Sequence, residues 1–487
     1  MRWRDVLEPA RMARVAIVAP SARMRRVLVE VADSGLVEPE RFPELPPGPA
    51  SQALERARRS VPVMARSTSG AASAPAAGSE PTRSGPVLML QAPDIARLEQ
   101  AGDVDLLAGE ADLEQVRAGA LEDGSVGAVA GWCPSRVVSG LSDRLASNGG
   151  AVVRLEMPKG DEPPTQMAGR GAAGAFQPLV DTYATVAYRD INPSIVAGVA
   201  YMAMFGMMFG DAGDGALLVA AGVMLWLGYP ASLKRLRWAG PFLAGGGLAS
   251  IGFGFAYGEA FGPTGLVPVL WLRPLANATE LLAVAVAAGA GLLAVSYVLG
   301  TVNRWREGGV GNALLAVSGA AGIAMYLGIG VVGLGWYRHL DPLMLVGGVL
   351  AGAGGILGFA GFFAQSAGST GGAVQAGVEM FDAVVRLGTN TVSFARLAAF
   401  GLTHAALGSI VWSATAGLWH RGGVVSVVAS VVVFAVGTAV AFALEALVAG
   451  VQALRLEYYE LFSRIFDVEG RPFRPWHVPT YCSEEVP

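Results

Sequence analysis

Hydrophobic and polar residues are distributed differently in the two halves of this chain of 487 residues. Up to about residue 190 charged and apolar residues are mixed, and beyond it long apolar runs alternate with short polar breaks. A helix needs about 20 apolar residues to cross a bilayer. The pattern therefore predicts an N-terminal cytoplasmic domain over 1–190, an α-helical polytopic membrane domain over 191–470 and a cytoplasmic C-terminal tail over 471–487.

The first 190 residues predict alternating strands and helices. RVAIV at 14–18 reads as a strand, and Ser21 as the N-cap of a helix that Gly35 ends. Residues 41–86 are rich in Pro, Ala, Ser and Gly and predict a flexible linker. Beyond it we expect a strand at 87–90, helical segments over about 94–118, a strand at 126–132, a helix at 135–146 and a strand at 151–156. The alternation favours a small α/β domain, with α+β as the alternative.

The second half predicts about eight transmembrane helices. The apolar stretches lie at 193–210, 213–229, 239–258, 278–301, 312–334, 342–364, 376–418 and 423–465. The first two are short and joined by GDAGDG, so they favour a tight helical hairpin. The last two exceed one span and should tilt strongly or extend beyond the bilayer. Six spans with one re-entrant hairpin is the alternative.

The cationic residues predict the orientation of these spans. They cluster at 234–237, at Arg304 and Arg306, and again at Arg464, Arg471 and Arg474. All of these positions fall on one side of the membrane if both termini are cytoplasmic, as the positive-inside rule expects. The N-terminus also lacks the long apolar core of a signal peptide. We therefore expect a multi-pass protein of a prokaryotic plasma membrane with both ends inside.

Composition agrees with a membrane protein and argues against several functions. The chain is 53% hydrophobic and 15% charged and has 66 glycines, which is typical of helices packed closely in lipid. Its two cysteines, Cys133 and Cys482, offer no metal-type spacing and are expected to be unpaired thiols. We see no phosphate-binding glycine loop and no basic patch. The sequence therefore predicts no cofactor, no metal, no ATP site and no nucleic-acid partner.

One arginine, Arg396, lies near the middle of the apolar stretch 388–408. A charge at bilayer depth costs roughly 2.5–3.5 kcal/mol, so such a residue faces a partner or a water-filled path. On a continuous helix the polar residues around it form one stripe, with Val, Leu and Ala opposite; they are Asp382, Arg386, Thr389, Ser393, Thr403 and His404. The stripe marks a bundle interface or an aqueous path. Ser393 and Thr403 have a simpler alternative in bonds to their own helix, and His404 in an interhelical hydrogen bond.

The final apolar stretch carries Glu445 and, ten residues later, Arg455. Glu445 is a candidate relay for protons or cations, and a buried ion pair with an arginine of the neighbouring helix is the alternative. Farther along, Glu457 and Glu460 flank Tyr458 and Tyr459 close to the predicted cytoplasmic boundary. For these two tyrosines an interfacial aromatic collar is the favoured interpretation.

Four motifs together resemble the a subunit, also called subunit I, of rotary V/A-type ATPases. The hairpin PSIVAGVAYMAMFGMMFGDAGDG at 193–215 is similar to the family's FGMMFGDxGHG. NTVSFARLAAFGLTHAAL at 390–407 resembles its arginine-bearing helix, EALVAGVQALRLEYYELFSRIF at 445–466 its last helix, and GRPFRP at 470–475 its tail. GWCPS at 131–135 and GDEPPT at 160–165 also match. The resemblance covers most of the chain from about residue 126 onward.

The resemblance implies a stationary subunit that holds two offset aqueous half-channels against a rotating ring of proteolipid c subunits. It makes Arg396 the essential arginine facing each ring carboxylate and Arg455 its supporting arginine. Glu445, Asp382, Ser393 and His404 match polar positions of the H⁺ or Na⁺ path. The implied partners are the c ring, the peripheral and central stalks, the catalytic subunits and the bilayer, and this chain would be a non-catalytic subunit.

The sequence departs from this family in three places. Asp214 stands where the family usually has histidine, YATVAY at 183–188 lacks a proline usual there, and the cytoplasmic half is short, without sustained heptads. Two other functions therefore stay open. One is a secondary transporter or channel that works alone with Arg396 and Glu445, although no internal repeat is visible. The other is an assembly subunit that no longer transports.

Overall fold

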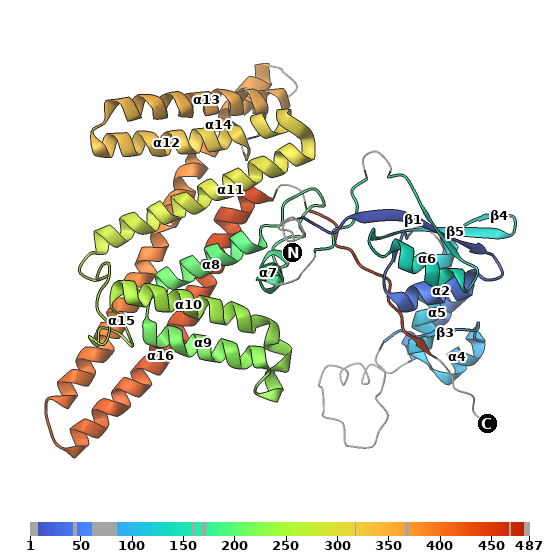
Figure 1. Ribbon diagram of the computed structural model, residues 1–487, viewed down its shortest axis with the longest axis horizontal. Coiled ribbons are helices and arrows are strands. Elements are labelled where there is room, and N and C mark those ends of the chain that lie inside the picture. The colour runs from blue at the N-terminus through green and yellow to red at the C-terminus, as the bar shows by residue number, and fades with distance from the viewer. Residues whose placement is uncertain are drawn as a thin grey trace. The chain divides into compact units, whose positions relative to one another are not determined.

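The computed structural model describes residues 8–41, 46–60, 85–157, 161–167, 172–316, 318–365, 370–466 and 469–481. The chain divides into two compact units, which are considered separately (Figure 1). We call Met1–Pro9 with Met167–Glu469 the helical unit, and Ala10–Gln166 with Gly470–Pro487 the sheet unit. Residues 470–481 therefore fold with the N-terminal segment, although the whole helical unit separates the two in the sequence.

The sheet unit is built around β1 (Met12–Pro20). Alternate residues of this strand are buried, as in a sheet with one face on a core. β1 pairs antiparallel with β5 (Val126–Pro134) along its whole length and with β6 (Ala151–Arg154) on its other side. Two short strands, β2 (Glu38–Pro39) and β4 (Leu121–Asp123), pair with β5. The sheet order is thus β2-β5-β1-β6, and the expected mixed α/β character of this part is confirmed.

Helices α2 (Met24–Ser34) and α6 (Val138–Ala146) supply much of the core of this unit. Gly35 ends α2 in the left-handed conformation, with φ 58°, as the sequence predicted. The predicted N-cap was wrong: the cap position is Arg23, without a side-chain hydrogen bond. Its amide donates to Pro20 O at 2.8 Å, so a turn precedes the helix and Ser21 lies within that turn.

The predicted linker is shorter than expected, because residues 49–60 form helix α3 (Pro49–Ser60). Ala53 and Ala57 are one helical turn apart and pack on Leu107 of α5 (Val104–Ala118), which α4 (Ile95–Ala101) precedes. A carboxylate of α5, Glu114 Oε2, accepts from the amides of Ala50 and Ser51 in the first turn of α3. Residues 61–84 of the predicted linker lie outside the described residues.

The C-terminal segment closes the sheet unit. Trp476 and Val478 are almost fully buried in its core, and Trp476 Nε1 donates to Asp112 Oδ2 at 2.6 Å. β7 (Thr480–Tyr481) pairs parallel with β3 (Leu88–Met89). Because these contacts join the two ends of the sequence, the sheet unit is complete only when the tail is in place. Cys133 is a free, buried thiol, and Cys482 lies outside the described residues.

The helical unit contains a helix in every apolar stretch that the sequence predicted. Its helices are α7 (Ala172–Asp181), α8 (Ser194–Met208), α9 (Ala212–Leu227), α10 (Gly240–Tyr257), α11 (Ala278–Leu315), α12 (Ala320–Arg338), α13 (Asp341–Gln365), α14 (Thr370–Ser393), α15 (Ala395–Trp419) and α16 (Val424–Leu456), with a 3₁₀ helix η2 (Ala231–Ala239) between α9 and α10. Six helical stretches of the described chain are long and apolar enough to cross a membrane, and the last two are the longest. The polytopic helical fold is confirmed.

The first two apolar helices, α8 and α9, are shorter than a full span, as a hairpin requires. The count thus agrees with the alternative of six long helices and one hairpin. The hairpin packs on α10 through positions without side chains. A Cβ on Gly222 would lie 2.5 Å from the backbone nitrogen of Ala244, and one on Gly215 would lie 2.8 Å from Gly247 O. Such small residues let membrane helices approach closely.

Three of the long helical stretches are irregular. α11 is kinked at Gly309, whose φ is 77°. The stretch expected to be one helix over 376–418 is one helical stretch over 371–419, with an irregular residue, Phe394, between α14 and α15. The last stretch continues from α16 through a π-helical turn, η3 (Glu457–Phe462), into α17 (Ser463–Ile465). Local changes of helix type often accompany functional sites. In Figure 1, α15 and α16 lie side by side as the orange and red helices of the helical unit.

Candidate functional site

Arg396 occupies the second position of α15, just after the irregular residue Phe394. The Phe394 ring is fully buried and lies against Gly289 of α11, where an added Cβ would be 2.0 Å from Phe394 Cγ. Gly289 thus leaves room for the Phe394 ring just ahead of Arg396.

The guanidinium of Arg396 is incompletely paired. Its Nη1 atom is buried and makes no hydrogen bond to any residue that the structure describes. The nearby charged groups that interact with it are the Arg455 cation and the Glu460 carboxylate. Arg455, on α16, is exposed. A buried donor without an acceptor costs about 1–3 kcal/mol, more when it is charged. Two cations at this point favour the approach of an anion.

His404 lies on the same helix eight residues beyond Arg396, which corresponds to about 12 Å at 1.5 Å per residue. Its ring is buried, and its Nδ1 atom is in hydrogen-bond contact with Oε2 of Glu445 on α16. The other ring nitrogen, Nε2, lies 4.0 Å from Oε2 of Glu259. The structure thus joins two of the predicted site residues, His404 and Glu445, and adds a second carboxylate that the sequence analysis did not identify.

Two further carboxylates converge on His404 from the hairpin, Asp211 and Asp214. Asp211 is the N-cap of α9: its Oδ1 accepts from the amides of Gly213 and Asp214, at 2.8 and 3.0 Å. The same side chain reaches the loop after α10, where Phe261 and Gly262 donate to it at 2.8 Å each. Four amide donors therefore fix the position of this carboxylate.

Asp214 and Glu259 are less well satisfied than Asp211. Both side chains are more than nine-tenths buried. Asp214 Oδ1 and Glu259 Oε2 have no hydrogen-bond donor among the described residues. One ligand atom each from Asp211, Asp214 and His404 lie within 4.8 Å of one another. We call Asp211, Asp214, Glu259, His404 and Glu445 the histidine cluster.

The remaining predicted residues lie on α14, on the other side of Phe394. Asp382 forms an exposed ion pair with Arg386 at 2.6 Å, which gives Arg386 a partner. Ser393 is the last residue of α14. With its amide nitrogen turned toward Glu460, Asn390 bridges this carboxylate at 3.1 Å and Arg464 at 2.9 Å. The predicted stripe is therefore divided at Phe394 into two groups.

Two hydroxyls of the stripe have the simpler structural role. Thr389 Oγ1 donates to Val385 O at 3.1 Å, and Thr403 Oγ1 to Ala399 O at 2.9 Å. Such bonds to the preceding turn satisfy a hydroxyl in lipid without any functional implication. For Thr403 this is the alternative that the sequence analysis had named.

Sequence reasoning missed three acidic residues, each for a different reason. Glu259 follows α10 in a loop, and its distance from His404 in sequence hides their proximity. Asp211 reads as an ordinary N-cap. Glu457 was placed near a polar boundary, yet it is fully buried and neither of its carboxylate oxygens has a hydrogen-bond partner among the described residues. The available signal was an acidic residue directly flanking an apolar run.

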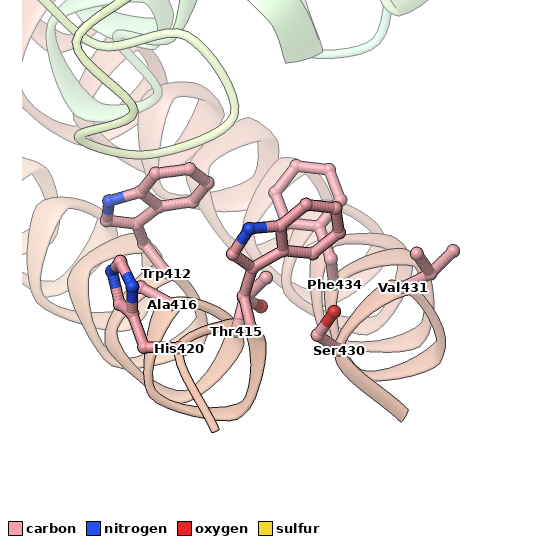
Figure 2. Close-up of a pocket in the computed structure, with 8 residues that line it drawn as sticks. Trp412, Thr415, Ala416, His420, Ser430, Val431 and Phe434 are labelled. Carbon is pink, nitrogen blue, oxygen red and sulfur yellow. The ribbon is translucent and has the colours of Figure 1, made fainter. Parts of the chain in front are cut away.

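A cavity of about 390 Å³ lies between α15 and α16, away from these charged residues (Figure 2). Trp412, Trp419 and Phe434 form much of its wall. Its two hydroxyl residues, Thr415 and Ser430, donate to carbonyls of their own helices, at 2.8 Å each. The cavity therefore offers mainly apolar surface. A second cavity, of about 280 Å³, is lined by Glu259 and by Arg273 of the loop after α10, so it adjoins the histidine cluster.

Comparison with known proteins gives a consistent result. Residues 122–237 and 374–478 match the V-type ATPase 116 kDa subunit family. The matched segments contain every residue of the histidine cluster except Glu259, together with Arg396 and Arg455.

Individual relatives agree with the family match. The A-type ATP synthase subunit I of Halobacterium salinarum is 26% identical over an alignment of 408 residues, which covers 70% of this chain and 55% of that protein. Its counterpart from Pyrococcus horikoshii is 25% identical, over 72% of this chain and 54% of that protein. The human V-type proton ATPase 116 kDa subunit a 3 is 31% identical over an alignment of 155 residues, which covers 29% of this chain and 19% of that protein. The chain spans about half the length of the curated relatives that it matches first.

Proposed function

Because the chain belongs to the V-type ATPase 116 kDa subunit family, we propose that it is the stationary membrane subunit of a rotary ATPase. In this role it forms two half-channels for H⁺ or Na⁺ against a ring of c subunits and binds no ATP itself. Ion flow through the half-channels is coupled to the catalytic subunits by rotation of the ring. The stalks connect those subunits to this chain, and both of its termini are cytoplasmic.

The observation that carries the proposal is the unpaired, buried Nη1 of Arg396. A carboxylate that arrives on another polypeptide supplies the acceptor that this nitrogen lacks. It forms a charge-assisted hydrogen bond there. Arg455 contributes a second cation. The two arginines keep the arriving carboxylate ionised and prevent ions from passing directly between the half-channels.

The polar residues on the two sides of Phe394 support two separate paths. On one side are His404 and Glu445, next to the cavity that Glu259 and Arg273 line. On the other side are Ser393 and the Asp382–Arg386 pair of α14. With cytoplasmic termini, the chain direction of α15 assigns the histidine cluster to the half-channel that opens outward. The α14 residues then belong to the one that opens to the cytoplasm.

The outer surface of α16 supports a docking face for the ring. Only 6% of its most apolar window is buried within this chain, against 33% for the α14–α15 stretch. Leu444, Leu447 and Val451 are more than half exposed on this helix. Glu445 and Arg455 lie on the same helix. A transporter that works alone needs an acceptor for Arg396 within its own chain, which the described residues do not provide.

The test is ATP-driven ion transport by the complete complex reconstituted in vesicles. Arg396→Ala is expected to abolish transport, while the detached soluble sector hydrolyses ATP as before. Arg421→Ala, in the exposed loop after α15, is the matched control and should transport normally. Full pumping by the Arg396→Ala complex would contradict the proposal. Purification of the chain without a c ring and catalytic subunits would favour the independent transporter.

A further inference from the structure

The histidine cluster has the geometry of a metal site. We propose that Asp211, Asp214, Glu259 and His404 bind one divalent transition-metal ion, of which Zn²⁺ is the probe of choice. Such a metal ion would stay bound or inhibit transport, so it differs from the transported H⁺ or Na⁺. Its binding does not depend on rotation of a c ring. The proposed site rests on the arrangement of four side chains in three separate segments of the helical unit.

The first step is the orientation of the imidazole. His404 Nδ1 is in contact with Glu445 Oε2. A carboxylate that only accepts favours the tautomer with the proton on Nδ1, which leaves the lone pair on Nε2. Histidines that bind metals almost always donate their second ring nitrogen to a carboxylate or carbonyl in this way. Glu445 is therefore a positioning residue, and Nε2 is the ligand atom.

The second step is what faces Nε2. Glu259 Oε2 lies 4.0 Å from Nε2. One oxygen each of Asp211 and Asp214 and one ring nitrogen of His404 lie within 4.8 Å of one another. Four ligands about 2 Å from a tetrahedral zinc ion are roughly 3.3 Å apart. The side chains therefore need to move inward by about an ångström, which χ rotations of Asp and Glu allow.

The third step is the set of unused acceptors. Asp214 Oδ1 and Glu259 Oε2 are buried and have no donor among the described residues. Asp211 Oδ2 accepts from Gly262 alone among the described residues, so it retains a lone pair. Unpaired oxygens that are more than nine-tenths buried and lie beside a histidine ring point to a cation.

The ligand types indicate the class of metal. One nitrogen and three oxygens suit Zn²⁺ and related first-row ions better than Mg²⁺ or Ca²⁺, which prefer oxygen ligands only.

The site also differs from what the family pattern offers. The resemblance gives histidine at the position of Asp214. In this chain an anionic oxygen stands there instead and faces His404. Occupancy by a metal would hold His404 and Glu445 in one arrangement, and these are the residues proposed for the outward half-channel.

The experiment measures metal binding by the full chain, purified in detergent without a polyhistidine tag and freed of metal with a chelator. Addition of Co²⁺ should give the visible absorption of a four-coordinate site at one equivalent per chain, and Zn²⁺ should displace it. X-ray absorption at the zinc edge should find nitrogen and oxygen ligands only, with one imidazole. This second measurement needs no variant.

Variants identify the ligands. Asp214→Asn and His404→Gln should each weaken binding at least tenfold. Asp341→Asn and His420→Gln, at exposed positions elsewhere in the helical unit, are the matched controls and should bind normally. Binding well below one equivalent, or binding that Asp214→Asn and His404→Gln leave unchanged, overturns the proposal. Arg396→Ala should keep the metal while it loses transport, so a failure of the ion-path proposal is distinguishable from a failure of this one.

Discussion

The ion pairs of the sheet unit contrast with the charged groups at the candidate site of the helical unit. In the sheet unit, Arg14 reaches both oxygens of Glu40, at 2.7 and 2.9 Å, and Arg25 bonds both oxygens of Glu110. In the helical unit, Arg396 Nη1, Asp214 Oδ1 and Glu259 Oε2 are buried without a hydrogen-bond partner among the described residues. Paired charges of the first kind stabilise a fold. Unpaired charges of the second kind lower stability and are retained where a function needs them.

The largest effect is expected from a substitution in the C-terminal segment of the sheet unit. Trp476→Ala removes a buried indole and its hydrogen bond to Asp112, so it should cost the sheet unit about 3–5 kcal/mol. Hydrogen exchange of the full chain in detergent should show that the β1 and β5 amides lose protection while those of α12 and α13 do not. Unchanged protection in β1 would mean that the tail lies on a sheet unit already complete without it.

Removal of one partner from a buried ion pair should have the next largest effect. Glu110→Ala leaves Arg25 with the carbonyls of Met89 and Gln91 as acceptors, at 2.9 and 3.1 Å. We expect a loss of about 3 kcal/mol in the same exchange measurement. Glu55→Ala breaks the exposed pair with Arg59 and is the control, with an expected change below about 0.5 kcal/mol. Equal effects of the two variants would remove the distinction between buried and exposed pairs.

The role of the unpaired Arg396 in the helical unit is tested by a substitution that shifts its position. Gly289→Ala places a Cβ 2.0 Å from Phe394 Cγ, and such overpacking costs about 1–3 kcal/mol. The resulting shift at the start of α15 should lower ATP-driven transport about tenfold although Arg396 is intact. Gly291→Ala, two residues away, meets no atom within 4 Å and should transport normally. Equal transport by both variants would show that Phe394 does not position the arginine.

The sequence was informative where a local pattern decides the outcome. Apolar runs predicted the long helices, and Gly35 ended α2 as expected because its left-handed backbone is a local requirement. The irregular residue Phe394 was not predicted, because its ring packs on Gly289, more than a hundred residues earlier in the sequence. The helix α3 was missed since a Pro/Ala-rich composition outweighed the spacing of Ala53 and Ala57.

The candidate site shows the same limit. Arg396, His404 and Glu445 could be identified because a charged or polar residue in an apolar run is expensive wherever it occurs. Glu259 could not be identified in this way. Its place in the site depends on its distance to His404, which only the packing of α10 and α15 determines. Asp382 and Arg386, which the sequence analysis placed in the stripe of Arg396, form an ion pair with each other.

The smallest change in stability is expected for a buried group that stays neutral, the Cys133 thiol. Burial raises the pKa of the Cys133 thiol from 9.0 to about 11. The folded state therefore keeps a proton that the unfolded state releases above pH 9, so stability falls as the pH rises from about 9 to 11. By pH 10 the loss is about 1.4 kcal/mol, since one pKa unit corresponds to 1.36 kcal/mol. Cys133→Ala should remove this part of the slope in denaturant unfolding between pH 8 and 10. An identical slope in the variant would mean that the thiol ionises as easily inside the sheet unit as in water, and that burial without a partner carries no penalty there.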